Sequence, residues 1–472
     1  MALTKAHNRM IEGAAVNVKD FGAVGDGVTD DTAAIQAAID SLGSSGGTVY
    51  MPKGIYKTTA AIIVKDSVIL KGSGKSTWGT TQGTVINNST ASGPILQIGN
   101  AAFNRGMAVE DLDLVGASKQ IDGLEILDDC YNIKLGNIGV NNCDNAFVFN
   151  NCWNINASSL VANTANTGFY FTGTAGGTSS IFTSCVAYTC TNYGWHFAVP
   201  GWTYSSWHSC GADNAGVGLY VAGGSYRGSS FYNWGFENCA TSCIKVNNVN
   251  ADIVLNSVNF SVNNGASAVY FDIDDCRRCV IRDVVLTSGS IPTQDLFDLT
   301  GNTGDIILEN WYFNASGGTG DFSGILNDRI QLNSSYFWGN TSLTQLGHVR
   351  DYYKDLSQEM LGLGVSDLTV SGRVVYRSHI AVSTNGGGNR FLIGDGASPI
   401  FSLTRVKDYE IIRITNVDST NQVGFRTEAY TGNPPGIVAH STTAATTIYL
   451  DPGDTVQFMK YPDGKLHEIK QA

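Results

Sequence analysis

The chain has 472 residues, of which 55 are glycine and only 15% are charged. This composition favours a protein of many tight turns over one built from charged surface helices. A net charge of −12 argues against the basic surface that nucleic-acid binding requires. Residues 1–13 lack the apolar core of a signal peptide, and no apolar run is long enough to span a membrane. We therefore expect neither a nucleic-acid partner nor a membrane partner.

Between residues 16 and 52 the sequence predicts a strand, one helix and a second strand. Asp30 or Asp31 is placed to cap the helix, and Gly46-Gly47 ends it. Its apolar residues follow the i, i+3, i+4, i+7 spacing of an amphipathic helix: Ile35, Ala38, Ile39 and Leu42. A single helix of this kind ahead of a repeated structure is expected to cover the first repeat, as terminal caps do.

A sequence repeat of about 24 residues occupies the middle of the chain. Apolar residues open a short strand in each repeat: Leu112, Leu135, Leu160, Cys185, Cys210, Trp234, Val258, Val284, Leu308 and Leu332. The position two residues later lies on the same face of the strand: Leu114, Asn137, Ala162, Ala187, Ala212, Phe236, Phe260, Leu286, Asn310 and Ser334. Most residues of this second set are apolar as well.

Such a repeat, without helical periodicity and rich in turn residues, indicates a right-handed parallel β-helix with about 24 residues per coil. One coil cannot bury its own inner face, so neighbouring coils must stack to form a core. The Leu-x-x-Leu-x-Leu spacing of leucine-rich repeats is absent. We therefore predict an all-β, single-stranded solenoid with an N-terminal capping helix.

The ten cysteines are best explained as reduced, buried thiols of this core, because Cys185 and Cys210 are ladder residues and Cys239 lies close to another. The pair Cys276 and Cys279 has the spacing of a redox motif, but it lacks a second pair or a matching fold context. We expect no metal site and no cofactor.

After the repeats the sequence changes character. Residues 346–364 indicate a short helix or linker, and 365–472 contain short β-rich runs between turn signals, which is typical of an antiparallel β-sandwich. The expected organisation has five parts: an N-terminal tail or neck (1–15), the cap and first coils (16–110), the central β-helix (111–345), the linker (346–364) and the C-terminal sandwich (365–472).

Two N-terminal stretches, residues 20–37 and 47–56, resemble the opening motif of the pectate-lyase-like superfamily. Within that superfamily, residues 8–17 and the Asn- and Cys-rich coils resemble bacteriophage tailspikes and capsule depolymerases. The resemblance covers roughly residues 8–340. It implies that Asp26, Asp30 and Asp31 are structural residues of the cap.

The same resemblance implies a homotrimer located in the virion, which acts outside the phage on a bacterial surface polysaccharide. It also implies that the C-terminal module serves trimerisation or glycan contact. Attachment to the phage tail or baseplate is expected through the N-terminus. Whether this attachment uses an anchoring domain that was removed or a short adapter stays open.

The strongest candidate for chemistry is a pair of outward carboxylates. If Cys210 and Ala212 point inward, Asp213 points outward, and Glu237 has the corresponding position one coil later. Adjacent strands lie about 4.8 Å apart, and glycosidases use two carboxyl groups at short separation, about 5 Å for retention and 6.5–9.5 Å for inversion. We therefore assign Asp213 and Glu237 as candidate catalytic residues.

Aromatic and polar side chains of nearby coils are expected to bind the glycan, since aromatic faces stack on sugar rings. The candidates are Tyr188, Trp195, His196, Tyr204, Trp207, His208, Tyr232, Asp272 and Asp274. Trp234 is assigned to the core instead. Asp272 and Asp274 suggest either a binding contact or a cation site, although the neighbouring Arg277 and Arg278 favour a salt-bridged turn.

Two alternatives remain. A polysaccharide lyase would need a base and a positive charge opposite a uronate carboxylate, for which the candidates are Tyr188, His196, His208, Arg227 and Lys245. A receptor-binding fibre would keep the aromatic residues and need no catalysis. The sequence does not identify the polysaccharide, nor does it show whether the site lies within one chain or between subunits.

Overall fold

The computed structural model describes residues 14–287, apart from 77–82, 91, 101–102, 199–200 and 261–268, together with the strands between 297 and 468 that are named below. The chain forms two compact units, Met1–Ile281 with Leu296–Gly304, and Arg282–Asp295 with Asp305–Ala472. In the part of the chain so described, no helix is long and apolar enough to cross a membrane. The predicted tail at residues 1–13 lies outside the described residues.

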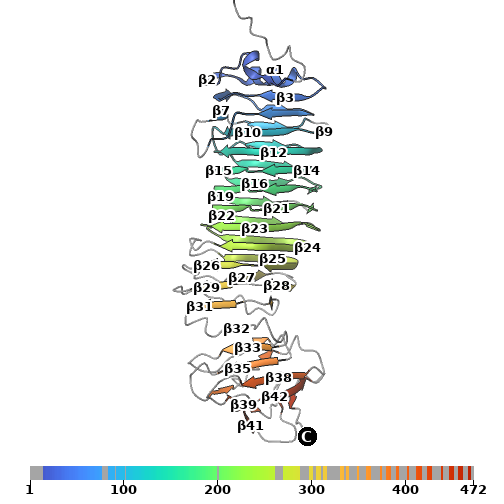
Figure 1. The fold of residues 1–472 in the computed structure, drawn as a ribbon, viewed down its shortest axis with the longest axis vertical. Helices are drawn as coiled ribbons and strands as arrows, with labels where there is room; N and C mark the ends of the chain where they lie inside the picture. The colour runs from blue at the N-terminus through green and yellow to red at the C-terminus, as the bar shows by residue number, and fades with distance from the viewer. Residues whose placement is uncertain are drawn as a thin grey trace, which may run out of the picture. The chain divides into compact units, whose positions relative to one another are not determined.

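The first unit is a stack of β-coils in which the strands pair in parallel with strands of neighbouring coils (Figure 1). One inner row shows the pattern: Ala162 pairs with Ala187, Ala187 with Ala212, and Ala212 with Phe236. All four side chains are buried. Because the coils differ little in length, equivalent residues stay in register along the stack, which buries a continuous core. The predicted parallel β-solenoid is confirmed.

Each coil bends at a small polar residue in the left-handed conformation, directly before the first ladder residue. These residues have φ between 52° and 61°: Asp111, Asn137, Ser159, Ser184, Ser209, Asn233 and Ser257. Asn and Asp tolerate this conformation better than other residues with a side chain, because their polar groups bond locally. Neighbouring bends also bond to one another, as Asn137 Nδ2 donates to Asp111 Oδ1 at 2.9 Å.

One coil of the predicted ladder was misaligned. Leu112 pairs with Ile138 and Leu114 with Val140, rather than with Leu135 and Asn137. The reason is that Asn137 is the left-handed bend of this coil, so the ladder position follows it. Leu135 is still buried, but it belongs to the preceding strand segment, where it pairs with Val109 and Ala157.

The core of the first unit contains many stacked rings. The Phe169 ring lies 3.8 Å from Trp195 between centroids, and Phe171 lies 4.1 Å from Phe197. Trp234 is buried, as predicted, and donates its indole N–H to the carbonyl of Trp207 at 3.1 Å. All ten cysteines are buried and free of disulfides, which confirms the interpretation as reduced core thiols.

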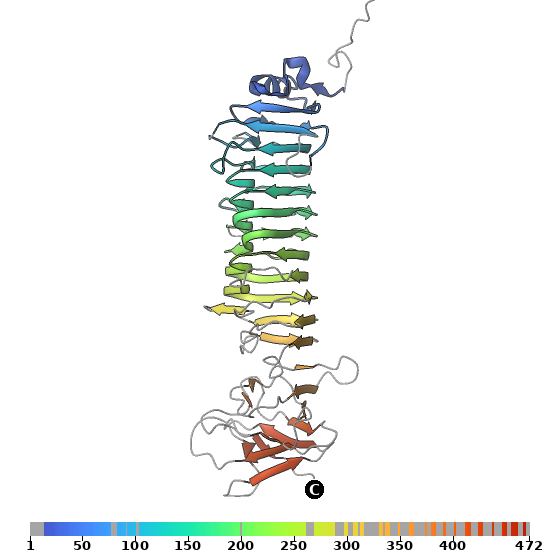
Figure 2. The same ribbon diagram turned by 90° about the vertical axis from the view of Figure 1, so that its left-hand side faces the viewer.

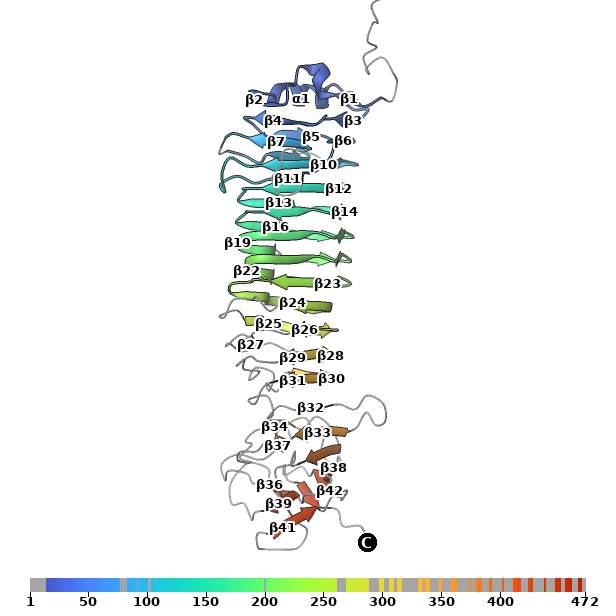
Figure 3. The same ribbon diagram turned by 60° about the vertical axis from the view of Figure 1, so that its left-hand side comes forward.

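The N-terminal cap begins with β1 (Val16–Asn17), the 3₁₀ helix η2 (Val18–Phe21) and β2 (Asp26–Asp30), followed by α1 (Thr32–Asp40). The expected first strand is therefore interrupted by η2. Helix α1 lies across the end of the stack, above β4 and β5 in the view of Figure 3, and also covers that end in Figure 2. Its buried residues, Ile35, Ala38 and Ile39, are those that the helical spacing predicted.

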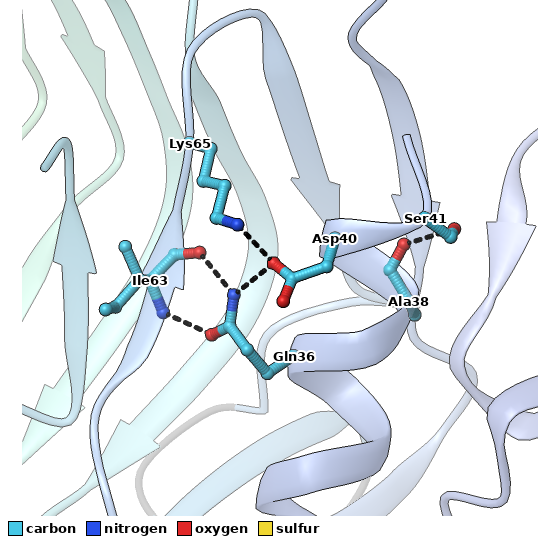
Figure 4. Close-up of polar contacts among 6 residues, drawn as sticks. All are labelled: Gln36, Ala38, Asp40, Ser41, Ile63 and Lys65. Atoms are coloured by element: carbon cyan, nitrogen blue, oxygen red, sulfur yellow. Dashed lines mark hydrogen bonds and ion pairs between the residues drawn. The ribbon is translucent and has the colours of Figure 1, made fainter. Parts of the chain in front are cut away.

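Polar contacts fix α1 to strand β5 (Ile62–Val64) (Figure 4). The Gln36 amide donates to the carbonyl of Ile63 at 3.2 Å and accepts from its N–H at 2.9 Å. Gln36 also donates to Asp40, which forms an ion pair with Lys65. The helix thus satisfies backbone groups of a strand that has no preceding coil.

The three aspartates of the opening motif are structural. Asp31 accepts hydrogen bonds from the N–H groups of Val24 and Gly25 at 2.6 and 2.9 Å. Asp30 accepts from the Thr32 N–H at 3.0 Å at the start of α1. Asp26 accepts from the N–H groups of its own turn. The predicted structural role of these aspartates in the cap is confirmed. Of the two candidates for capping α1, Asp30 is the one whose side chain accepts a hydrogen bond from the first residue of the helix.

The other strands of the first unit vary in length from two residues, as in β9, to 19 residues in β24. They are β3 (Gly47–Tyr50), β4 (Gly54–Thr58), β6 (Val68–Lys71), β7 (Thr84–Asn88), β8 (Leu96–Ile98), β9 (Asn104–Arg105), β10 (Ala108–Val115), β11 (Leu124–Ile126), β12 (Cys130–Asn141), β13 (Asn145–Asn150), β14 (Trp153–Ser158), β15 (Val161–Asn163), β16 (Thr167–Thr172), β17 (Gly177–Thr178), β18 (Ile181–Thr183), β19 (Val186–Phe197), β20 (Trp202–Thr203), β21 (Ser206–His208), β22 (Gly211–Ala222), β23 (Ser230–Glu237), β24 (Ser242–Phe260), β25 (Val269–Arg282) and β27 (Phe297–Thr300).

The second unit contains further parallel strands, in which Leu308 pairs with Leu332 as predicted. Leu286 pairs with Phe313, whereas the predicted ladder residues Asn310 and Ser334 lie outside the described residues. These strands are β26 (Val285–Thr287), β28 (Asp305–Glu309), β29 (Tyr312–Ala315), β30 (Ile330–Asn333) and β31 (Tyr336–Gly339).

The segment predicted as a short helix or linker contains two strands instead, β32 (His348–Val349) and β33 (Gln358–Gly362), which pair antiparallel. The strands that follow pair in both senses: β35 is parallel to β33 and β38, whereas β38 is antiparallel to β42. The expectation of purely antiparallel pairing is therefore wrong, and the sandwich packing stays a prediction. The strands are β34 (Arg373–Val374), β35 (His379–Ser383), β36 (Arg390–Leu392), β37 (Phe401–Ser402), β38 (Ile411–Asn416), β39 (Val423–Thr427), β40 (Ile437–Val438), β41 (Thr446–Leu450), β42 (Thr455–Lys460) and β43 (Leu466–Glu468).

Candidate functional site

Two carboxylates lie opposite each other on adjacent coils. Asp213 of β22 pairs in parallel register with Glu237, the last residue of β23. Their neighbours Ala212 and Phe236 are buried, so the alternation along a strand directs both carboxylates outward. Asp213 also accepts a hydrogen bond from Asn238 Nδ2 at 2.9 Å. The predicted positions of the two carboxylates are confirmed, while their role stays a proposal.

The carboxylates continue a row of outward polar side chains. Tyr188 pairs with Asp213, Asn163 with Tyr188, and Asn141 with Asn163. Asn163 donates to the Asn141 side chain at 2.7 Å. Because all five residues occupy one register position on successive coils, they form a line parallel to the axis of the stack, with the carboxylates at one end. We call this line the carboxylate row.

Two glycines lie beside the carboxylates. Gly211 and Gly235 precede Asp213 and Glu237 by two residues, and they pair with each other. A Cβ atom placed on Gly235 would meet nothing within 4 Å, whereas one on Gly211 would lie 2.7 Å from the Gly235 carbonyl oxygen. Open space therefore lies above the strand at Gly235, next to Glu237.

His208 and Tyr232 occupy the strand segment before the carboxylates. They pair in register, with ring centroids 5.7 Å apart, and both are exposed. The left-handed bends at Ser209 and Asn233 separate them from the carboxylate row. Tyr204 lies at a bend of its own, with φ of 51° and 69% of its surface exposed. These three predicted binding residues are thus accessible.

Two of the predicted binding residues belong to the core. The side chains of Trp195 and Trp207 are completely buried. Trp195 stacks on Phe169 and donates its indole N–H to the carbonyl of Gly211 at 2.9 Å, and Trp207 stacks on Phe231 at 4.8 Å. A glycan cannot reach either ring, so the prediction that they bind substrate is wrong. Both occupy inward positions, where large apolar side chains fill the stack.

A second cluster lies on the next strand segment of each coil. His196 pairs with Tyr220, and Tyr220 pairs with Lys245. The His196 ring stacks on Tyr220 at 4.9 Å, and Tyr193 contacts both rings, at 4.5 and 5.4 Å. The sequence pointed to His196 and Lys245 but not to the two tyrosines. The signal that would have found Tyr220 is its spacing of 24 residues from His196 and 25 from Lys245.

Asp272 joins this second cluster. Its carboxylate forms an ion pair with Lys245 Nζ at 2.5 Å. Asp272 and Asp274 lie in strand β25, which bends at Asp275 (φ 49°) before it reaches Arg277 and Arg278. A salt bridge in this bend stays a prediction. Among the described residues, no group of three or more His, Cys, Asp or Glu side chains is arranged to hold a metal ion.

Burial changes the acid–base properties of the cluster. Desolvation lowers the pKa of His196 from 6.5 to about 4, so its imidazole is neutral at pH 7. Desolvation also raises the pKa of Tyr220, which stays protonated. The pKa of Lys245 is raised by its hydrogen bond to Asp272, so the ammonium is retained. A neutral imidazole, a phenol and an ammonium group therefore occur on three successive coils.

Comparison with known families gives a match in the part of the chain that forms the cap and the first parallel coils. Residues 15–220 match the family described as rhamnogalacturonase A/epimerase, pectate lyase-like. The match includes the opening motif and supports the resemblance seen there.

More distant likenesses cover short or divergent regions. The chain is 54% identical over 66 residues to mannuronan C5-epimerase AlgE4 of Azotobacter vinelandii, a match that spans 12% of each protein. The structure of the AlgE6 A-module from the same organism aligns with a TM-score of 0.49, at 20% identity over 68% of this chain and 96% of that one. ORF18 of Geobacillus virus E2 aligns with a TM-score of 0.47, at 20% identity over 69% and 61%.

Proposed function

We propose that the protein cleaves a bacterial surface polysaccharide by endo-acting hydrolysis, with Asp213 and Glu237 as the catalytic pair. The observation that carries the proposal is the parallel register that places these two outward carboxylates on adjacent coils. Glycoside hydrolysis requires one carboxyl group that protonates the leaving oxygen and a second that acts as nucleophile or base. Here both come from one chain, on a surface with accessible tyrosines and a histidine nearby.

The register also suggests the stereochemistry. Backbones of adjacent strands lie about 4.8 Å apart, and retaining enzymes hold their two carboxyl groups about 5–5.5 Å apart. We therefore propose retention, with Asp213 as nucleophile and Glu237 as acid. The hydrogen bond from Asn238 Nδ2 holds the Asp213 carboxylate in position, and Glu237 is the more exposed of the two.

The polymer is proposed to lie along the carboxylate row. Tyr188, Asn163 and Asn141 continue this row away from Asp213, and amide and phenol groups are common hydrogen-bonding partners of sugar hydroxyls. Gly235 leaves space for a sugar ring beside Glu237. His208, Tyr232 and Tyr204 are proposed as flanking contacts.

The wider setting is proposed from the resemblance to tailspikes. The protein would form a homotrimer in the virion, attach to the phage tail or baseplate through its N-terminus, and act outside the cell on the host surface. The C-terminal strands would serve trimerisation or glycan contact. A sedimentation measurement of mass in solution tests the trimer directly.

The function is tested by incubating the protein with a panel of bacterial surface polysaccharides. Reducing ends and the ultraviolet absorbance of unsaturated uronates are measured together, for wild type, Asp213→Asn and Glu237→Gln. We expect new reducing ends without absorbance from wild type and their loss in both variants. Reducing ends that persist in both variants would refute the catalytic pair. A polymer that is bound but never cut would show a non-catalytic adhesin.

A further inference from the structure

A further row of outward side chains lies on another strand segment of the coils that carry the carboxylate row. Tyr131 pairs with Trp153. Thr178 then pairs with Trp153 on one side and with Thr203 on the other. The residues that precede three of these four are buried in the core, which directs the row outward: Cys130, Cys152 and Trp202. We call Tyr131, Trp153, Thr178 and Thr203 the tryptophan row.

The tryptophan row is separate from the carboxylate row. Trp153 and Asn163, for example, belong to the same coil, but two left-handed bends lie between them, at Asn154 and Ser159, each with φ of 55°. Strand residues Ile155–Ser158 form the straight segment between the two bends. Because the chain changes direction at each bend, the two rows lie on different faces of the stack.

Trp153 is the last ring of the tryptophan row. Its indole is parallel to the Tyr131 ring within 5°, with the two centroids 5.6 Å apart, and the Phe103 ring packs edge-on against Tyr131 at 6.3 Å. Since Tyr131 covers one face of the indole, the opposite face is turned toward the coil of Thr178. A threonine side chain is too small to cover an indole, and Trp153 is only half-buried. The row therefore presents an aromatic face next to a hydroxyl group.

Hydroxyl groups continue the row beyond the indole. Thr203 Oγ1 donates to Thr178 Oγ1 at 3.1 Å, and the Ser179 hydroxyl lies 3.3 Å from Thr178 Oγ1. Each hydroxyl can donate one hydrogen bond and accept two, so this short chain of hydroxyls keeps hydrogen-bonding capacity for a ligand. None of the residues that form it carries a charge.

Tyr204 adds an exposed ring at the bend that follows the row. It continues the bend positions of Asn154 and Ser179, and it has the same left-handed conformation, with φ of 51°. A bulky side chain is uncommon in this conformation, and outliers of this kind cluster at functional sites. The ring extends over the next coil, because a Cβ atom on Gly228 would lie 2.7 Å from Tyr204 Cδ1. With 69% of its surface exposed, Tyr204 is accessible to a ligand that lies on the row.

We propose that the tryptophan row and Tyr204 form a second, non-catalytic binding site, which holds uncharged sugar residues of the polysaccharide. The apolar face of a sugar ring would stack on the open face of Trp153, while its hydroxyl groups exchange hydrogen bonds with Thr178 and Thr203. A protein partner of standard interface size buries about 800 Å² on each side, and a row that is one residue wide is narrow for such a partner. A single polymer chain fits it better.

Two binding sites on different faces strengthen the binding of a long polymer. Once one part of the chain is held at the tryptophan row, another part meets the carboxylate row at a raised effective concentration. An oligosaccharide too short to reach both rows gains nothing. The second site rests on the proposed function only in taking a polysaccharide as its ligand, and it needs neither Asp213 nor Glu237.

The test measures binding without cleavage. The Asp213→Asn, Glu237→Gln double variant is run by affinity electrophoresis through gels that contain dextran or one polymer of the surface polysaccharide panel. On this background, Trp153→Ala should weaken binding by about tenfold.

Thr178→Phe is the second variant, because the register places the new ring on the open face of Trp153. It should keep the fold, exclude the sugar and weaken binding to a similar extent. Val28→Ala is the control: Val28 is 75% exposed on β2 of the cap, and its replacement should leave binding unchanged.

Kinetics separate anchoring from catalysis. With Asp213 and Glu237 intact, Thr178→Phe should raise KM for the long polymer by about tenfold and leave kcat unchanged. KM for short oligosaccharides should stay the same.

Unchanged binding in both Trp153→Ala and Thr178→Phe would overturn the second site, as would the absence of binding to every polymer. A change of sedimented mass in Thr178→Phe would overturn it as well, in favour of a contact with a second copy of the chain. Binding that depends on Trp153 while no reducing ends appear would leave the second site standing and refute hydrolysis. Reducing ends together with normal binding by both variants would do the reverse.

Discussion

Asp213 lies directly opposite Glu237 on the neighbouring coil, in a parallel register that also pairs Gly211 with Gly235. Two like charges in adjacent outward positions repel each other, and cross-strand pairs of this kind destabilise a sheet. The stack retains them beside two residues that lack side chains. A pair of carboxylates next to unoccupied space is the arrangement that binding and cleavage of a sugar chain require.

Replacing either carboxylate is expected to stop hydrolysis without affecting the fold. Asp213→Asn and Glu237→Gln each remove one acid–base group, so kcat should fall by about 10²- to 10⁴-fold. The melting temperature should stay the same or rise, because the repulsion between the carboxylates is relieved. Reducing-end assays and thermal melts measure both. A variant that loses activity only because it melts early would leave the catalytic role unsupported.

Gly235 is expected to determine whether a sugar ring fits beside Glu237. Gly235→Leu fills space in which a Cβ meets nothing within 4 Å, so the fold should tolerate it, while KM should rise about tenfold or more, equivalent to about 1.4 kcal/mol. Gly211→Leu is the contrasting variant, since its Cβ would lie 2.7 Å from a carbonyl oxygen, and it should lower the melting temperature. An unchanged KM for Gly235→Leu would place the polymer elsewhere.

Trp195 is expected to matter for stability and not for binding. It is fully buried between Phe169 and the next coil, so Trp195→Ala should cost about 3–5 kcal/mol of unfolding free energy. Chemical denaturation measures this cost. Tyr232→Ala is the comparison, because Tyr232 is 47% exposed; it should weaken glycan binding and leave stability nearly unchanged.

Acid is expected to destabilise the first unit through His196. Its pKa is about 4 in the folded chain and about 6.5 when exposed to solvent. Between these values the unfolded state binds more protons than the folded state, so this contribution to stability is complete above pH 6.5 and is lost as the pH falls toward 4. His196→Gln should flatten this part of the melting-temperature profile. An equally steep profile in the variant would assign the acid sensitivity to other groups.

The cap is expected to depend on Gln36. Its amide bonds to both backbone groups of Ile63, so Gln36→Ala would leave a partly buried donor and acceptor without this partner, at a cost of about 1–3 kcal/mol. Hydrogen exchange at the Ile63 amide reports the loss directly. Gln36→Glu is the comparison: it keeps the acceptor for the Ile63 N–H, loses the donor to the Ile63 carbonyl and to Asp40, and adds a negative charge beside Asp40. The Ile63 amide should therefore exchange more slowly in Gln36→Glu than in Gln36→Ala.

The carboxylate pair was predictable because a strand alternates inward and outward with period 2, and because the coils around it differ by only one or two residues. Counting one coil of 24 residues from Asp213 leads to Glu237, and the structure pairs these two residues. The same counting failed at Leu135, since Asn137 forms the bend of that coil. An asparagine that forms a left-handed bend cannot be distinguished, from the sequence alone, from an asparagine at a ladder position.

The sequence by itself determined the repeated coil, the capping helix and the outward positions of Asp213 and Glu237, because these follow from local periodicity. Only the tertiary structure decided which aromatic residues face solvent, burying Trp195 and Trp207 while leaving Tyr204 and Tyr232 exposed. It also brought His196, Tyr220 and Lys245 together and lowered the pKa of His196. Ring stacking and desolvation depend on neighbours about 25 residues away along the chain, and local patterns do not encode them.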